Sequence, residues 1–185
     1  MKISILIPTF NNLSYLKFFL NSLKKNSLFK HEIVIHVNDG SDGTLDFVKK
    51  SNFKFTHSKE NIGLCSSMNN AYKLSTSDFL LYAHDDMYFC KNWDKYLIDE
   101  INKQKNNFYY LSGTNVSTRF GLINYNCGDA LENFDENKFL KFCIDDNTPD
   151  LQSSHWAPHL IHRELWDKIG GFSEEFNPGD GSDPD

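Results

Sequence analysis

Two adjacent carboxylates, Asp85 and Asp86, follow an apolar run and could hold a metal ion or a polar ligand. A strand that buried both would be penalised, because an unpaired buried charge costs more than it returns. Hard cations such as Mg²⁺ and Mn²⁺ prefer carboxylate oxygens and often share them with substrate phosphates. One carboxylate could therefore hold a metal while its neighbour holds a ribose or a second ligand. An isolated pair of adjacent aspartates lies just as often in a solvated loop that binds nothing.

A second polar stretch, Asp39-Gly40-Ser41-Asp42-Gly43, is dense in turn-forming residues. Its glycines could let the backbone approach a flat ligand or a phosphate. The stretch matches neither a Walker loop nor a GxGxxG fingerprint, so on its own it favours a plain turn.

A third acidic group lies near the end of the chain and consists of Asp180, Asp183 and Asp185. A carboxylate in a cleft could act as a general base toward a hydroxyl group. Taken alone, these residues favour a solvated acidic loop.

Histidines and cysteines give weaker signals. His159 and His162 lie three apart in a predicted strand, so they would face opposite sides, which argues against joint metal ligation. The cysteines match no zinc-binding spacing and are interpreted as reduced thiols, with a disulfide left open. The sequence has no GxSxG motif and no Cys/His pair, so nucleophilic hydrolysis is not supported.

Apolar runs and helical spacing alternate along the first 111 residues. Strands are predicted over 3–7, 32–38, 53–57, 78–82 and 108–111, and helices over 13–25, 44–50, 64–74 and 93–103, with Asn11-Asn12 as a helix cap. This alternation predicts an α/β fold with a mostly parallel sheet and right-handed crossovers.

Ligands of such folds bind beyond the carboxyl ends of the strands. Three polar features follow predicted strands, namely Pro8-Thr9, Asp39–Ser41 and Asp85-Asp86. We therefore expect them to converge at one edge of the sheet.

Beyond residue 111 the periodic pattern weakens. The polar segment 112–150 holds one short helix candidate, over 137–144, and is typical of a binding loop or lid. Order returns with a predicted strand over 156–162 and a helix over 163–169, which Gly170-Gly171 ends.

The bulk properties bound the class of protein. The chain has 185 residues, 39% hydrophobic content and a formal net charge of −6. This composition fits one folded domain and argues against a disordered chain or a surface that coats nucleic acid. The sequence has no signal-peptide core and no apolar run near the ~20 residues of a membrane helix. We expect a cytoplasmic protein, with peripheral attachment at the inner face of the membrane left open.

Five segments in this order resemble family 2 glycosyltransferases of the GT-A fold: ISILIPTFNN, VNDGSDGT, ENIGLCSSMNNAY, YAHDD and GGFSEEFNPGDGSDPD. The resemblance covers the chain almost end to end. It implies one GT-A domain over 1–185, with 1–111 as the nucleotide-sugar-binding half and 112–185 as the acceptor-side half. Because the chain stops on an acidic loop, we interpret it as the catalytic part of a longer protein.

The resemblance also implies a reaction. A sugar would pass, with inversion, from a UDP-, GDP- or dTDP-sugar to a glycan, lipid-linked or protein acceptor. A divalent cation, Mn²⁺ or Mg²⁺, would assist, as in enzymes of polysaccharide biosynthesis.

Site residues follow from the same resemblance. The donor-binding positions are Pro8, Thr9, Asp39, Asn69 and Asp85. Asp86 matches the carboxylate that meets the metal bridging the diphosphate, and Asp183 matches the catalytic base. The segment 156–172 looks like the one that flanks the acceptor.

The chain departs from the family pattern at three positions and in the loop at Asp39, which is a residue shorter than usual. Ala83 stands at the first acidic position of the longer motif, Ser182 replaces a common Glu, and Met68 stands where many members carry an Arg that contacts the diphosphate. Two other functions stay open: a donor-binding domain without turnover, and a metal-dependent nucleotidyltransferase. The second is disfavoured, because PTFNN is not the Gly-rich, Lys- or Arg-bearing phosphate loop that it would need.

Overall fold

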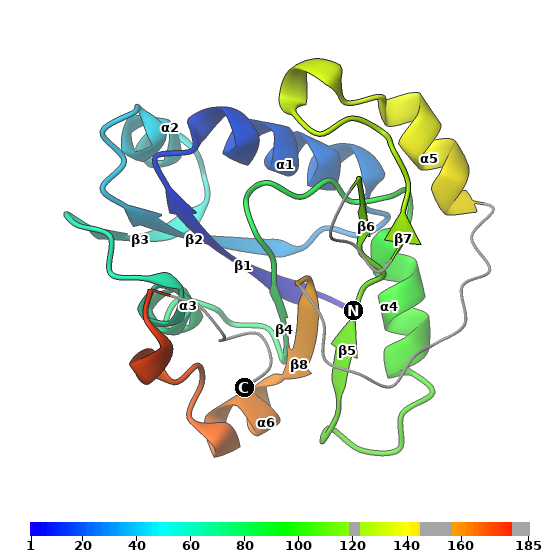
Figure 1. The fold of residues 1–185 in the computed structure, drawn as a ribbon. Helices are drawn as coiled ribbons and strands as arrows, with labels where there is room; N and C mark the ends of the chain where they lie inside the picture. Colours follow the sequence, from blue (N-terminus) through cyan, green and yellow to red (C-terminus); the bar gives the residue numbers. More distant parts are fainter. Residues whose placement is uncertain (119–122, 145–156, 179–185) are drawn as a thin grey trace.

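The computed structural model describes residues 1–118, 123–144 and 157–178. Its main sheet has six strands in the order β3-β2-β1-β4-β8-β5 (Figure 1). The bounds of these strands, in chain order, are β1 (Ile3–Phe10), β2 (Glu32–Asn38), β3 (Lys54–Ser58), β4 (Phe79–Tyr82), β5 (Tyr110–Ser112) and β8 (His159–His162). A separate short pair is formed by β6 (Val116–Ser117) and β7 (Ile123–Asn124).

The helices follow the predicted alternation with the strands. They are α1 (Leu13–Asn26), α2 (Thr44–Lys50), α3 (Leu64–Tyr72), α4 (Trp93–Ile101), α5 (Glu136–Ile144) and α6 (Arg163–Ile169), with 3₁₀ turns η1 (Leu131–Asn133) and η2 (Glu174–Phe176). None of these described helices is long and apolar enough to span a membrane.

The first four strands of the sheet order run parallel, which confirms the predicted mostly parallel sheet. β1 pairs with both β2 and β4, so the carboxyl ends of these three strands lie at one edge. β8 is antiparallel to both neighbours and inserts between β4 and β5. The sequence predicts a strand here, but its direction and its place in the sheet emerge only from the structure.

Helices cover both faces of the sheet (Figure 1). On one face, α1, α2 and α4 pack on the odd-numbered β1 and β4 residues, such as Ile5 and Leu81. On the other face, α3 and α6 pack on residues such as Leu6 and Leu80. Burial on both faces explains why the central strands β1 and β4 are mostly apolar. Each fully buried Ile or Leu contributes about 1.5–3 kcal/mol to this core.

The cap of α1 differs in part from the prediction. Asn12 occupies the N-cap position, but its side chain does not bond to the helix. Asp42, in the loop after β2, accepts hydrogen bonds from the Leu13 N–H at 2.9 Å and the Thr44 N–H at 3.0 Å. One carboxylate therefore joins the start of α1 to the start of α2, while the Asn12 amide is free to serve the site.

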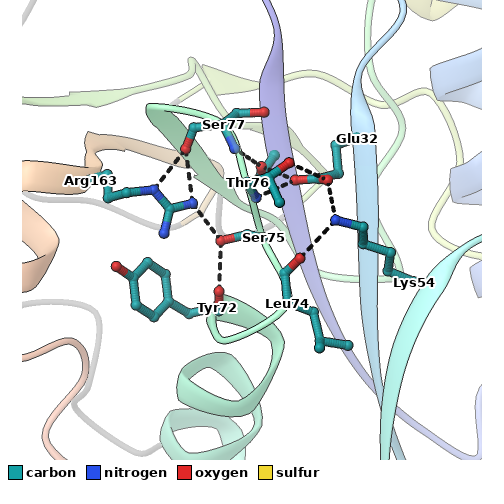
Figure 2. Close-up of polar contacts among 9 residues, drawn as sticks. Glu32, Lys54, Tyr72, Leu74, Ser75, Thr76, Ser77 and Arg163 are labelled. Carbon is teal, nitrogen blue, oxygen red and sulfur yellow. Dashed lines mark hydrogen bonds and ion pairs between the residues drawn. The ribbon is translucent and has the colours of Figure 1, made fainter.

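A polar network ties the opposite edge of the sheet together (Figure 2). Buried Glu32 accepts hydrogen bonds from the Lys54 ammonium at 2.7 Å and the Thr76 N–H at 2.7 Å. Nearby, the Arg163 guanidinium donates to the Ser77 carbonyl and the Ser75 hydroxyl, and lies 4.8 Å from the centre of the Tyr72 ring. These contacts hold the turn that leads into β4.

The segment containing α5 packs against the end of α1. Glu136 accepts a 2.5 Å hydrogen bond from the Lys25 ammonium and a second one from the Tyr88 hydroxyl. Tyr88 follows the Asp85-Asp86 pair by two residues and also packs against Phe18 and Phe134. The α5 segment is thus attached next to the paired carboxylates.

Candidate functional site

A cavity of about 240 Å³ opens at the carboxyl ends of β1, β2 and β4. Its lining comes from the end of β1, the end of β2, the start of α3 and the loop after β4, and consists of Pro8, Thr9, Phe10, Asn12, Asn38, Asn61, Gly63, Leu64, His84, Asp85 and Pro178. The predicted convergence of polar features at this edge is confirmed for Pro8-Thr9 and Asp85.

Asp85 is the buried carboxylate of the cavity, with 9% of its surface exposed. The Thr9 hydroxyl donates to it at 2.5 Å, and the Asn12 amide donates at 3.1 Å. Burial raises the pKa of Asp85, and these two hydrogen bonds act in the opposite direction. Asp85 is therefore a fixed group, oriented by two neighbours before any ligand arrives.

Asp86 has a different environment. Its side chain is exposed, and it makes no hydrogen bond or ion pair with the described residues. Across the described ranges, no group of three or more His, Cys, Asp or Glu side chains could hold a metal by itself. A Mg²⁺-like cation usually takes one or two carboxylates and completes its shell with water and substrate phosphates. Asp86 is not among the residues that line the cavity, but it directly follows the lining residue Asp85, and one exposed carboxylate in that place fits this kind of cation.

Asp39 directly follows the lining residue Asn38 but does not itself line the cavity, and it has a left-handed backbone conformation with φ of 56°. Its carboxylate accepts hydrogen bonds from the Asn11 amide at 2.8 Å and the Ser41 hydroxyl at 3.0 Å. Asn11 in turn accepts from the Gly40 N–H at 2.9 Å. The hydrogen bonds from Asn11 and Ser41 lower the pKa of Asp39. The loops after β1 and β2 are thus joined, with the carboxylate ionised.

Several cavity residues escaped the sequence reasoning. Asn38, at the end of β2, donates to the Ser67 hydroxyl at 2.9 Å and accepts from the Ile62 N–H at 3.0 Å, which fixes the loop before α3. His84 lines the cavity and is hydrogen-bonded to the buried Tyr82 hydroxyl. The available signal was a polar residue at the end of a buried strand for Asn38, and just after the end of one for His84.

Asn69 lies on α3 and is absent from the residues that line the cavity. Its amide bonds to both the N–H and the carbonyl of Phe172. The preceding residue of α3, Met68, is fully buried in the core on that side of the sheet. The position where many family members carry an Arg therefore belongs to the core here. The predicted base Asp183 falls outside the described residues, with Asp180, Asp185 and His155.

The model of the family "Glycosyl transferase family 2" matches residues 4–165, which include both carboxylates of the Asp85-Asp86 pair. No match to the chain was found among curated proteins.

Solved structures share the fold. S. aureus TarS 1-349 in complex with UDP aligns with a TM-score of 0.68 and 22% identity, over 97% of this chain and 52% of that one. The same protein with UDP-GlcNAc gives a TM-score of 0.66 and 22% identity, over 94% and 49%. The mannosyltransferase PcManGT from Pyrobaculum calidifontis, in complex with GDP-Man and Mn²⁺, gives 0.63 and 16%, over 98% and 49%.

The chain spans about half the length of these structures. Its fold is GT-A, with a mostly parallel central sheet flanked by helices. Sequence, fold and the cavity at the carboxyl ends of β1, β2 and β4 agree, and the chain belongs to glycosyl transferase family 2.

Proposed function

We propose that the chain binds a nucleotide-diphosphate sugar in this cavity and transfers the sugar, with inversion, to an acceptor hydroxyl. The observation that carries the proposal is the pairing of a buried, oriented Asp85 in the cavity wall with an exposed Asp86 directly after it in the chain. Such a pair can orient a ligand with one carboxylate and recruit a cation with the other.

The nucleoside would lie along the loops after β1 and β2. Pro8 and Thr9 line the cavity from the end of β1, and Asp39 offers an ionised acceptor to a base or ribose N–H or O–H group. Asp85 would accept from a hydroxyl of the ribose or the sugar. Solved relatives of the same fold carry UDP, UDP-GlcNAc and GDP-Man, so UDP- and GDP-sugars are the first donors to test, followed by dTDP-sugars.

The cavity needs help to bind a diphosphate. No Lys or Arg is present among the described residues that line it, and buried Met68 cannot supply a charge. Asp86 would hold Mn²⁺ or Mg²⁺, which fits the Mn²⁺ in the PcManGT complex. When bound, the cation would supply Lewis-acid stabilisation of the charge on the leaving diphosphate.

Transfer itself requires deprotonation of a weak nucleophile. The acceptor oxygen would form a bond to the anomeric carbon as the bond to the β-phosphate oxygen breaks, which inverts that carbon. Asp183 would take the acceptor proton, a contribution typically worth about 10²–10⁴-fold in rate. The acceptor would be a glycan, a lipid-linked sugar or a protein, and the membrane-bound classes would bring the chain to the inner face of the membrane.

The test combines donors with point variants. The purified chain is incubated with Mn²⁺ and a panel of UDP-, GDP- and dTDP-sugars with acceptors of each class, and nucleoside diphosphate release is measured. Asp183→Asn should bind donor normally and stop transfer, while Asp185→Asn in the same segment should retain it. Metal-dependent binding without release for any acceptor would favour a donor-binding domain, and no binding to any donor would overturn the proposal.

A further inference from the structure

The chain just after α6 is fastened to helix α3 by two asparagines. The first is Asn177. Its side-chain NH₂ donates to the Ser66 hydroxyl at 2.8 Å, and its side-chain oxygen accepts from the Ser66 backbone N–H at 3.4 Å. The next residue, Pro178, accepts a 2.8 Å hydrogen bond from the Leu64 N–H. Figure 1 shows the result, with η2 beside the N-terminal end of α3.

The second fastening point is Asn69, one turn further along α3. Its carbonyl oxygen accepts from the Phe172 N–H at 3.1 Å, and its amide donates to the Phe172 carbonyl at 2.9 Å. The same amide also donates to the Glu174 carboxylate at 3.1 Å. Hydrogen bonds from Asn69 and Ser66 lower the pKa of Glu174. All the hydrogen-bonding groups of the Asn69 side chain are thus used on this one segment.

Each asparagine also requires a glycine opposite it. A Cβ at Gly63 would lie 2.5 Å from Asn177 Oδ1, and a Cβ at Gly171 would lie 2.6 Å from Asn69 Oδ1. Both glycines have positive φ, of 83° and 80°. A side chain at either position would therefore hold residues 171–178 away from α3. Glycine at 63 and 171 allows the two segments to pack in direct contact.

The contacts between residues 171–178 and α3, here called the clasp, form part of the cavity wall. Gly63 and Leu64 line the cavity at the start of α3, and Pro178 lines it from residues 171–178. Asn177, the neighbour of Pro178, lies 111 residues after its partner Ser66 in the sequence. We propose that Asn69 and Asn177 are positioning residues, which hold residues 171–178 against α3 so that Pro178 completes the wall of the donor cavity. The inference rests on the proposed function, because it assumes that the donor occupies this cavity.

A wall that is held in place before binding reduces the ordering that a ligand must impose, and this raises affinity. The linkage is reciprocal, so a donor that favours the closed wall must also stabilise the clasp. A purely structural clasp would stabilise the fold but would respond to no ligand.

The test uses alanine variants of both asparagines with a matched control. Asn177→Ala and Asn69→Ala each remove one fastening point, and Ser66→Ala is a milder third variant that keeps the backbone contacts. The control is Asn70→Ala, since Asn70 is the adjacent helix residue and its side chain, among the residues that the structure describes, bonds only to the Lys73 ammonium at 2.8 Å. Calorimetry measures the Kd of UDP-GlcNAc and GDP-mannose with Mn²⁺, and hydrogen exchange follows the amides of Leu64, Ser66 and Phe172.

The proposal predicts a Kd raised about tenfold in Asn69→Ala and Asn177→Ala, a smaller rise in Ser66→Ala and none in Asn70→Ala. Saturating donor should slow exchange of the three amides in the wild-type chain, and this slowing should be lost at Leu64 and Ser66 in Asn177→Ala and at Phe172 in Asn69→Ala. If a donor binds the wild-type chain but neither its Kd in the variants nor the exchange of the amides changes, the clasp is purely structural and the inference fails. If no donor binds the wild-type chain, the proposed function fails first.

Discussion

Thr9 and Asp85 lie 76 residues apart in sequence, yet the Thr9 hydroxyl donates a 2.5 Å hydrogen bond to the Asp85 carboxylate. The contact exists because β1 and β4 are parallel neighbours, so the end of β1, which holds Thr9, meets the loop after β4, which holds Asp85. Both side chains are buried, and the bond partly offsets the burial of a charge. It joins the two loops that the proposed donor would touch first.

Thr9→Val should destabilise the fold by about 1–3 kcal/mol, because it removes one of the two side-chain donors to a buried carboxylate without changing the side-chain shape. Donor affinity should fall as well, since Asp85 loses part of its orientation. Urea unfolding and calorimetry measure the two effects. Thr9→Ser keeps the hydroxyl and should lose much less of both; equal losses in the two variants would contradict this explanation.

His36 should make the fold sensitive to mild acid. It is buried on β2 between the hydroxyls of Thr56 and Ser58, and burial lowers its pKa to about 4. Because the unfolded chain takes up this proton near pH 6.5, stability is full above that pH and is lost as the pH falls through about 4.

His36→Gln should flatten the decline of unfolding free energy between pH 6.5 and 4 by about 1–3 kcal/mol. His31 has a lowered pKa and contributes with the same sign, so a residual slope is expected. Urea unfolding across this pH range provides the measurement. A variant whose slope equals that of the wild-type chain would show that His36 is not the responsible group.

Glu32 anchors the edge of the sheet away from the cavity (Figure 2). Its burial alone would raise its pKa, but hydrogen bonds from Lys54, Ser4 and Thr76 outweigh this and lower the pKa to about 2. The stabilisation is therefore present above pH 4.5 and is lost as the pH falls through about 2. Glu32→Gln should cost about 1–2 kcal/mol at pH 7 with donor affinity unchanged. A fall in affinity in the folded variant would count against the assignment of this network to stability alone.

Asp42 should act as the cap of α1 from a distant loop. Asp42→Ala leaves the Leu13 and Thr44 N–H groups without their acceptor and should cost about 1 kcal/mol. Asp42→Asn keeps an acceptor oxygen and should recover most of that loss. Thermal unfolding decides the matter, and an unchanged Tm in Asp42→Ala would show that water replaces the cap.

Much of the fold was predictable because local patterns carry it. Residues 3–7 and 32–38 are short runs rich in Ile and Val, which are typical of a strand buried on both faces, and the apolar residues from Leu13 to Leu23 recur at helical spacing. The meeting of Thr9 with Asp85 followed from the rule for parallel sheets, before any contact was known.

Other features depend on contacts between distant segments, which no local pattern records. The antiparallel β8 was predicted as a strand but could not be placed between β4 and β5. Asn12 reads as a helix cap, yet tertiary contact with Asp85 takes its amide and leaves the capping to Asp42. Asn69 matched a donor-binding motif, and its bonds to Phe172 become visible only when residues 103 apart are brought together.

On the proposed function, a nucleoside diphosphate binds this cavity through a cation held at Asp86. The direct measurement is calorimetric titration of UDP and GDP into the chain with Mn²⁺, and again with a chelator, for the wild-type protein and for Asp86→Ala. At least one nucleotide should bind with Mn²⁺, and this binding should be lost both in the chelator and in the variant. Equal affinity in all of these conditions, or no binding in any of them, would contradict the proposed function.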